Sequence, residues 1–95
     1  IKVAVLPLSK KDVLTPTAQK VYKMIRERWM SQYDETQSIG RRYRRQDEIG
    51  TPLCVTIDFD SIKDHSVTIR KRDTQAQIRV GIDSLIDAVA ENLSC

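Results

Sequence analysis

Ninety-five residues suffice for one small domain with a single core and are too few for two. The hydrophobic fraction is 40% with only five aromatic residues, which predicts an aliphatic core of Val, Ile and Leu. The net charge of +3 hides an asymmetry: residues 1–50 carry eleven Lys and Arg against six Asp and Glu, whereas residues 51–95 carry five against seven. A basic front half would suit a polyanion such as RNA, although an ordinary solvated surface explains an excess of this size equally well.

The chain shows no sign of membrane insertion or of a metal centre. No apolar run approaches the roughly 20 residues that a membrane span needs, and there is no signal-peptide pattern. Cys54 and Cys95 lack metal-ligand spacing and the chain has one His, which predicts a reducing compartment and no structural metal. The chain begins at Ile1 rather than Met, which favours a single domain, residues 1–95, that is a fragment of a longer protein.

The first third of the chain predicts a strand, a helix and a second strand. The apolar run Lys2–Leu8 predicts a buried strand that ends at Pro7. Thr15 and Pro16 predict a helix start, with Thr as N-cap and Pro at the first helical position. This helix extends over about four turns on an apolar stripe: Ala18, Val21, Tyr22, Ile25 and Trp29. That stripe favours core packing over base stacking for its two aromatic rings, and Met30–Tyr33 should be a short strand.

Residues 38–60 read SIGRRYRRQDEIGTPLCVTIDFD, which predicts a short helix, a Gly-Thr-Pro break and a buried strand. Ser38 supplies an N-cap oxygen, Gly50 ends the helix with a residue that adopts positive φ, and Pro52 forbids continuation. At about 100° per residue, one side of this helix forms a mainly apolar seam: Ile39, Tyr43, Gln46, Ile49 and Gly50. The opposite side gathers charged side chains: Arg41, Arg44, Arg45 and Glu48.

Arg42 departs from this pattern, because it lies on the flank nearest the apolar seam. A guanidinium turned toward the sheet must be paired to avoid an uncompensated buried charge. Asp34 or Asp58 could supply the carboxylate, so we predict a structural ion pair for Arg42. The three outer arginines suit phosphate oxygens, although a solvated face partly neutralised by an Arg44–Glu48 pair fits them nearly as well.

The remaining chain predicts strands, turns and a final helix. The segment Pro52–Phe59 is nearly continuous apolar and β-branched, as in strands covered on both faces. After a polar turn, Asp60–Asp64, the alternating run His65–Arg72 predicts a half-exposed strand, and Gln77–Val80 predicts the last one. Asp83 is predicted to cap a final helix whose apolar stripe has four members: Leu85, Ile86, Val89 and Leu93.

This element order predicts an α/β fold. A βαβαβ unit with right-handed crossovers places the first strand between the second and third strands of a parallel sheet. The two later strands extend one edge, which gives a mixed sheet with helices on both faces. We therefore expect a three-layer α/β/α architecture.

An enzymatic reading has little support in these residues. Asp58 and Asp60 bracket Phe59 at the end of a strand, where α/β proteins place working residues, and a carboxylate pair could do acid–base work or hold Mg²⁺. Nothing else converges on that pair, because there is no Gly-rich phosphate loop and no Ser/His/Asp set. His65 is better explained as a surface turn residue, so we expect binding rather than catalysis and no catalytic residues.

The run SIGRRYRRQDEIGTPLCVTIDFDS, residues 38–61, resembles the signature of the C-terminal anticodon-binding domain of glycyl-tRNA synthetase, a class II aminoacyl-tRNA synthetase. Weaker matches extend over almost all of the chain, with IKVAVLPLS at the front and VTIRKRDTQAQIRV behind. The resemblance implies a five-stranded mixed sheet of order 2-1-3-4-5, with strand 4 antiparallel and three flanking helices.

The resemblance also implies a ligand, the anticodon stem-loop of glycine tRNA, whose last two anticodon bases are cytosines. A carboxylate that accepts from the cytosine amino group is the side-chain match for that base. Ligands of open α/β sheets bind beyond the carboxyl ends of strands where the strand order reverses, here beside residues 9–12 and 58–61. The expected phosphate contacts are Lys10, Lys11, Arg41, Arg44 and Arg45. The bases are expected to be read near Asp58 and Asp60, together with Arg70 and Arg72 of the fourth strand.

For the parent protein, the resemblance implies an ATP-dependent glycine–tRNA ligase. It would be a cytoplasmic homodimer, with an organellar enzyme as the alternative, and would use ATP and Mg²⁺ in a catalytic domain of the same chain. This domain would need no cofactor and would contact no membrane. Two other hypotheses remain: a related non-charging domain, as in the accessory subunit of mitochondrial DNA polymerase, which would aid protein contacts and DNA binding, and a stand-alone small α/β protein.

Overall fold

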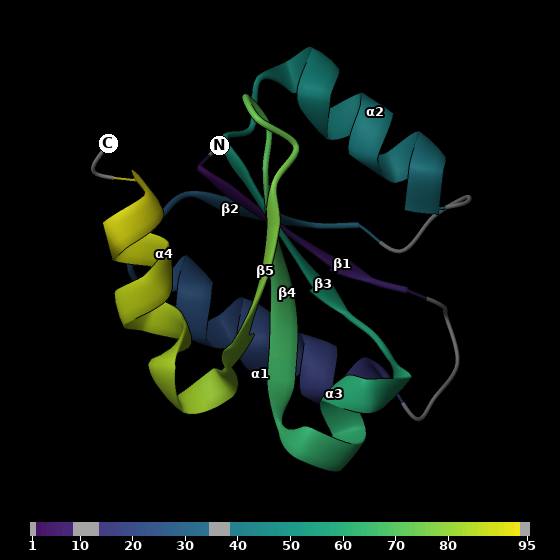
Figure 1. Cartoon of the computed structure of the whole chain (residues 1–95), viewed down its shortest axis with the longest axis vertical. Helices are drawn as coiled ribbons and strands as arrows, with labels where there is room; N and C mark the ends of the chain where they lie inside the picture. Colours follow the sequence, from purple (N-terminus) through teal and green to yellow (C-terminus); the bar gives the residue numbers. More distant parts are fainter. Residues whose placement is uncertain (1, 9–13, 35–38, 94–95) are drawn as a thin grey trace.

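The computed structural model describes residues 2–8, 14–34 and 39–93, which form a mixed β-sheet between two layers of helices (Figure 1). The strand order is β2-β1-β3-β4-β5. β1 pairs in parallel with β2 and β3, whereas β4 is antiparallel to both β3 and β5. The predicted strand order and the antiparallel fourth strand are therefore confirmed. The strands are β1 (Val3–Pro7), β2 (Ser31–Tyr33), β3 (Leu53–Ile57), β4 (Ser66–Lys71) and β5 (Gln77–Gly81).

Helix α2 (Ile39–Ile49) covers one face of the sheet, and α1 (Thr15–Arg26) and α4 (Leu85–Leu93) cover the other (Figure 1). The larger core lies under α1 and α4 and includes Val21, Ile25 and Leu85. A smaller cluster lies under α2: Ala4, Leu6 and Cys54, with Tyr43 packed against them. All five residues of β1 and of β3 are buried, which explains their continuous apolar sequence.

The prediction of three flanking helices misses a short fourth one, α3 (Phe59–Asp64), where we expected a polar turn. Its cause is local, because Asp58 and Ser61 form a capping box. The Asp58 carboxylate accepts from the Ser61 backbone N–H at 3.0 Å, and the Ser61 hydroxyl accepts from the Asp58 N–H at 3.1 Å. These two bonds satisfy donors that a helix start otherwise leaves unpaired.

Two predicted caps are also wrong. The N-cap of α1 is Leu14 without a side-chain bond, so Thr15 already lies inside the helix. Asp83 lies in a 3-10 turn, η1 (Ile82–Ser84), that precedes α4. The buried Ile82 donates its backbone N–H to the His65 carbonyl at 2.7 Å, which fixes the chain before α4 begins. The predicted cap at Ser38 lies outside the described residues, and within those residues no helix is long and apolar enough to cross a membrane.

Candidate nucleic-acid interface

The outer face of α2 is basic, as its helical spacing predicts. Four side chains line a shallow hollow of about 290 Å³ on this face: Arg41, Arg44, Arg45 and Glu48. Their spacing of three and four residues brings them onto one side of the helix, away from the sheet. The predicted grouping of these residues is confirmed.

These charges are only partly neutralised within the protein. Arg45 forms an ion pair with Asp34, whose side chain is 6% exposed at the end of β2. Arg44 and Glu48 are exposed, and neither has an ion-pair partner among the residues that the structure describes. The i, i+4 pair between them is therefore not formed. The guanidinium of Arg44 consequently remains open to an anion.

Arg42 points inward, as predicted, and is 1% exposed. Its guanidinium donates to three backbone carbonyls, those of Pro7, Leu8 (3.1 Å) and Asp34 (3.0 Å). The prediction that Asp58 could be its carboxylate partner is wrong, because Asp58 accepts from Arg79 instead, and Arg42 meets Asp34 through the backbone. Arg42 thus fastens α2 to the carboxyl ends of β1 and β2.

Arg70 is 8% exposed and links β4 to α2 rather than facing solvent. Its guanidinium lies 4.6 Å from the centre of the Tyr43 ring and donates to both carboxylate oxygens of Asp47, at 3.2 and 3.4 Å. The hydrogen bonds to Asp47 raise the pKa of Arg70 despite its burial. Its polar edge is therefore occupied within the protein.

Arg72 lies at the other end of the sheet from the expected base-reading site. Its backbone N–H donates to the Pro52 carbonyl, before β3 begins, and its side chain pairs with Asp73 at 3.1 Å. Asp58 follows the far end of β3, six residues on, which corresponds to about 20 Å along an extended strand. The structure does not bring Arg72 to Asp58 and Asp60 as we expected.

At the carboxyl ends of the central strands, two carboxylates have different surroundings. Asp58 caps α3 and pairs with Arg79, whereas Asp60 in the first turn of α3 is exposed and has no polar partner among the described residues. The Leu8 N–H donates to the Ile57 carbonyl at 2.7 Å, so the end of β1 lies beside this site. The predicted contacts at Lys10 and Lys11 lie outside the described residues.

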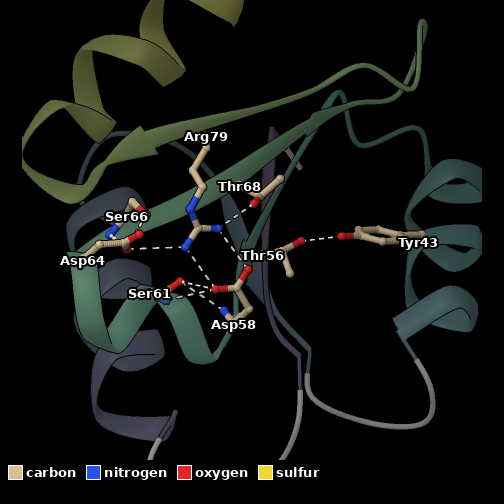
Figure 2. A network of polar contacts seen from close by, with 8 residues as sticks. All are labelled: Tyr43, Thr56, Asp58, Ser61, Asp64, Ser66, Thr68 and Arg79. Atoms are coloured by element: carbon tan, nitrogen blue, oxygen red, sulfur yellow. Dashed lines mark hydrogen bonds and ion pairs between the residues drawn. The ribbon is translucent and has the colours of Figure 1, made fainter.

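Arg79, which no sequence motif marks as a site residue, organises a polar network on the sheet face that α2 partly covers (Figure 2). Its guanidinium donates to both oxygens of Asp58, at 3.0 and 3.2 Å, to the Thr68 hydroxyl at 3.2 Å, and to Asp64 at 3.5 Å. Asp64 also accepts from the backbone N–H and the hydroxyl of Ser66. The only signal in the sequence is the alternation of β5, which says nothing about these partners.

The network shifts the titration of its members. Burial favours the neutral carboxyl of Asp58, but hydrogen bonds from Arg79 and Ser61 outweigh it and lower the pKa of Asp58. Hydrogen bonds from Ser66, with the charge of Arg79, lower the pKa of Asp64. The bonds to Asp58 raise the pKa of Arg79 in turn. The two carboxyls and the guanidinium are therefore charged at neutral pH. Within the described part of the chain, no three His, Cys, Asp or Glu side chains are grouped as a metal site would require.

Comparison with known proteins identifies close sequence relatives. The chain is 60% identical over 93 residues to a glycine–tRNA ligase of Corynebacterium glutamicum, covering 98% of this chain and 20% of that protein. It is 58% identical over 94 residues to a glycine–tRNA ligase of Bifidobacterium longum, covering 98% of this chain and 19% of that protein. The chain thus spans about a fifth of the length of these relatives.

Solved structures with low sequence identity share the fold. Prolyl-tRNA synthetase from Cryptosporidium parvum superposes with a TM-score of 0.91 at 16% identity, over 99% of this chain and 20% of that one. The RNA-binding domain of threonyl-tRNA synthetase from the same species, strain Iowa II, gives a TM-score of 0.83 at 24% identity, over 95% of this chain and 23% of that one. The family model described as an anticodon-binding domain matches residues 2–92, so this chain belongs to the anticodon-binding domain family.

Proposed function

We propose that the chain is the anticodon-recognition module of a glycine–tRNA ligase and binds the anticodon stem-loop of glycine tRNA. The observation that carries this proposal is the 60% identity, over nearly the whole chain, to a protein named glycine–tRNA ligase. The same observation favours a ligase over the accessory subunit of mitochondrial DNA polymerase. The module supplies recognition, and the chemistry belongs to the rest of the ligase.

The outer face of α2 supplies phosphate contacts in this proposal. Arg41, Arg44 and Arg45 line one hollow, and a guanidinium matches the geometry of phosphate oxygens. Such contacts position an RNA without reading its sequence. Lys10 and Lys11 are further proposed phosphate contacts. The buried Arg70, bound to Asp47, would act by holding α2 against the sheet.

Asp60 is the proposed reader of an anticodon cytosine. Its exposed carboxylate has no competing partner among the described residues, and it lies where ligands of open α/β sheets bind. A carboxylate accepts well from the cytosine amino group, whereas uracil presents an acceptor, O4, at the same position. Asp58 is less suited to this role, because both of its carboxylate oxygens already accept from Arg79.

For the whole ligase, the proposal includes the ATP-dependent charging of tRNA with glycine by a cytoplasmic homodimer. ATP and Mg²⁺ would bind in the catalytic domain of the same polypeptide. This chain would contribute the contacts that select the tRNA.

Binding to two RNA stem-loops tests the proposal. One stem-loop carries the glycine anticodon, and the other has uracils in place of the last two anticodon bases. The affinity of the protein for each stem-loop is measured by fluorescence anisotropy from about 50 to about 200 mM salt. We expect Asp60→Ala to reduce the preference for the glycine loop by about 1–3 kcal/mol. We expect Arg44→Ala to weaken binding to both stem-loops alike. It should also reduce the salt slope, which is the steepness of log affinity against log salt concentration, by about one.

Arg28→Ala is the matched control, since Arg28 is an exposed arginine just beyond α1, on the other side of the sheet. It should leave the discrimination between the two loops unchanged. A wild-type protein that binds neither loop would refute the proposed function. If Asp60→Ala weakens binding to both stem-loops equally, or to neither, Asp60 does not read a base.

A further inference from the structure

We propose that Arg79 is a stacking platform, whose guanidinium plane packs against an unpaired base of the bound RNA. This inference rests on the proposed function, because it requires single-stranded RNA on this face of the sheet. It adds a third kind of contact, which recognises the flat face of a base, to the proposed phosphate contacts and the proposed cytosine reader.

The hydrogen-bonding edge of Arg79 is already filled by the protein. One terminal nitrogen donates to Asp58 and Thr68, and the other donates to Asp58 and Asp64 (Figure 2). The two terminal nitrogens carry four hydrogens in total, and four acceptor contacts use them. A phosphate would have to displace two carboxylates to bind in their place. Arg79 is therefore poorly arranged as a phosphate clamp, unlike Arg44.

What remains for a ligand is the guanidinium plane, with one N–H at Nε. The side chain is 35% exposed, so part of it is accessible. A guanidinium is weakly hydrated and stacks readily on flat rings, and RNA-binding proteins use this contact for unpaired bases. Because three neighbouring side chains fix its orientation, binding a base costs little further side-chain entropy.

The position of Arg79 suits a base that lies beside the proposed cytosine reader. Directly paired residues share a face of a sheet, so Arg79 lies on the same face as its partner Thr68 and as Thr56 one strand further in. Figure 2 shows this network next to α2, from which Tyr43 reaches Thr56. Arg79 also holds Asp58, the cap of the helix whose first turn carries Asp60.

A purely structural role is the competing explanation, in which Arg79 ties β5 to α3. The substitution Arg79→Lys separates the two, because it keeps the charge and removes the plane. The probe is the glycine anticodon stem-loop with 2-aminopurine at one loop position at a time. We expect wild-type protein to change the fluorescence at one position and Arg79→Lys to lose that change. Affinity should fall about five- to a hundredfold, the range for one stacked base, with the salt slope unchanged.

Arg44→Lys is the matched control, since a phosphate contact needs charge and no plane; it should leave the fluorescence change intact. Circular dichroism verifies folding of each variant. If Arg79→Lys does not fold, Arg79→Tyr decides, because it keeps a plane without the charge and should retain the fluorescence change. The stacking inference is overturned if Arg79→Lys keeps the wild-type affinity and fluorescence change. It is also overturned if a folded Arg79→Tyr loses the fluorescence change. Either outcome leaves the proposed function standing. Absence of wild-type binding would overturn the proposed function together with the stacking inference.

Discussion

The arginine side chains of this protein have different surroundings. Arg42 donates to backbone carbonyls, and Arg70 and Arg79 donate to carboxylates, whereas Arg44 has no partner among the described residues. The two terminal nitrogens of the buried Arg42 guanidinium exchange water for protein acceptors. Removing it would leave those acceptors without their donor, and removing Arg44 would not.

Substitution of Arg42 should therefore reduce stability strongly. We expect Arg42→Ala to lower the free energy of unfolding by about 3–5 kcal/mol, because several charge-assisted hydrogen bonds and a buried side chain are lost together. Arg44→Ala should change it by less than about 0.5 kcal/mol, as for an ordinary exposed site. Urea denaturation followed by circular dichroism measures both. Equal midpoints for the two variants would show that Arg42 has no structural role.

At the scale of elements, α3 depends on one cap. This helix has six residues, too few for helical propensity to stabilise it alone. Asp58 accepts from the first turn and from Arg79 on β5, so the same carboxylate starts the helix and ties it to the sheet edge.

The charge of Asp58 should make stability sensitive to acid. Its pKa in the folded protein is lower than the ordinary value of 3.8, so the unfolded chain takes up the proton first. The stabilisation is present above that ordinary value and is lost as the pH falls through the lowered pKa. Asp58→Asn keeps a capping side chain and removes the charge. We expect it to cost at most about 1 kcal/mol at pH 7 and nothing in acid.

Thermal denaturation of both proteins between about pH 2 and about pH 7 measures this difference. Asp64→Asn serves as the control for the exposed partner of Arg79 and should cost less at neutral pH. A difference between wild type and Asp58→Asn that stays constant with pH would show that the cap acts without its charge.

At the scale of the whole molecule, both faces of the central strands are sealed by helices. Cys54 on β3 lies under α2, beside Ala4 and Leu6, and is 2% exposed. Burial raises the pKa of the Cys54 thiol to about 11, although the charge of Arg70 opposes this shift. The thiolate, which is the reactive form, is therefore scarce at neutral pH.

The reactivity of the Cys54 thiol measures how well α2 covers this face of the sheet. In a Cys95→Ser background, we expect the Cys54 thiol to react with a disulfide reagent at pH 8 at least about a hundredfold more slowly in the folded than in the urea-unfolded protein. The reason is that both access and thiolate fraction are reduced. Labelling at the same rate in both states would mean that α2 does not cover this face.

Local periodicity predicts the strands and most helices of this protein. The continuous apolar run of β3 predicts burial on two faces, and the spacing of Arg41, Arg44 and Arg45 predicts the basic side of α2. With the two connecting helices on opposite faces of the sheet, the right-handedness of crossover connections gives the order of the first three strands. The same run of residues, 38–61, carries the family resemblance that the comparison with the anticodon-binding domain model confirms.

The partners of the polar side chains follow only from the tertiary structure. Arg79 meets Asp58 because the register of β5 on β4 places it opposite Thr68, and no local pattern encodes that pairing. Arg42 meets backbone carbonyls, which every residue carries, so no residue type in the sequence marks them as acceptors. Spacing along a helix or strand is a property of neighbouring residues, whereas these contacts join segments that only the folded sheet brings together.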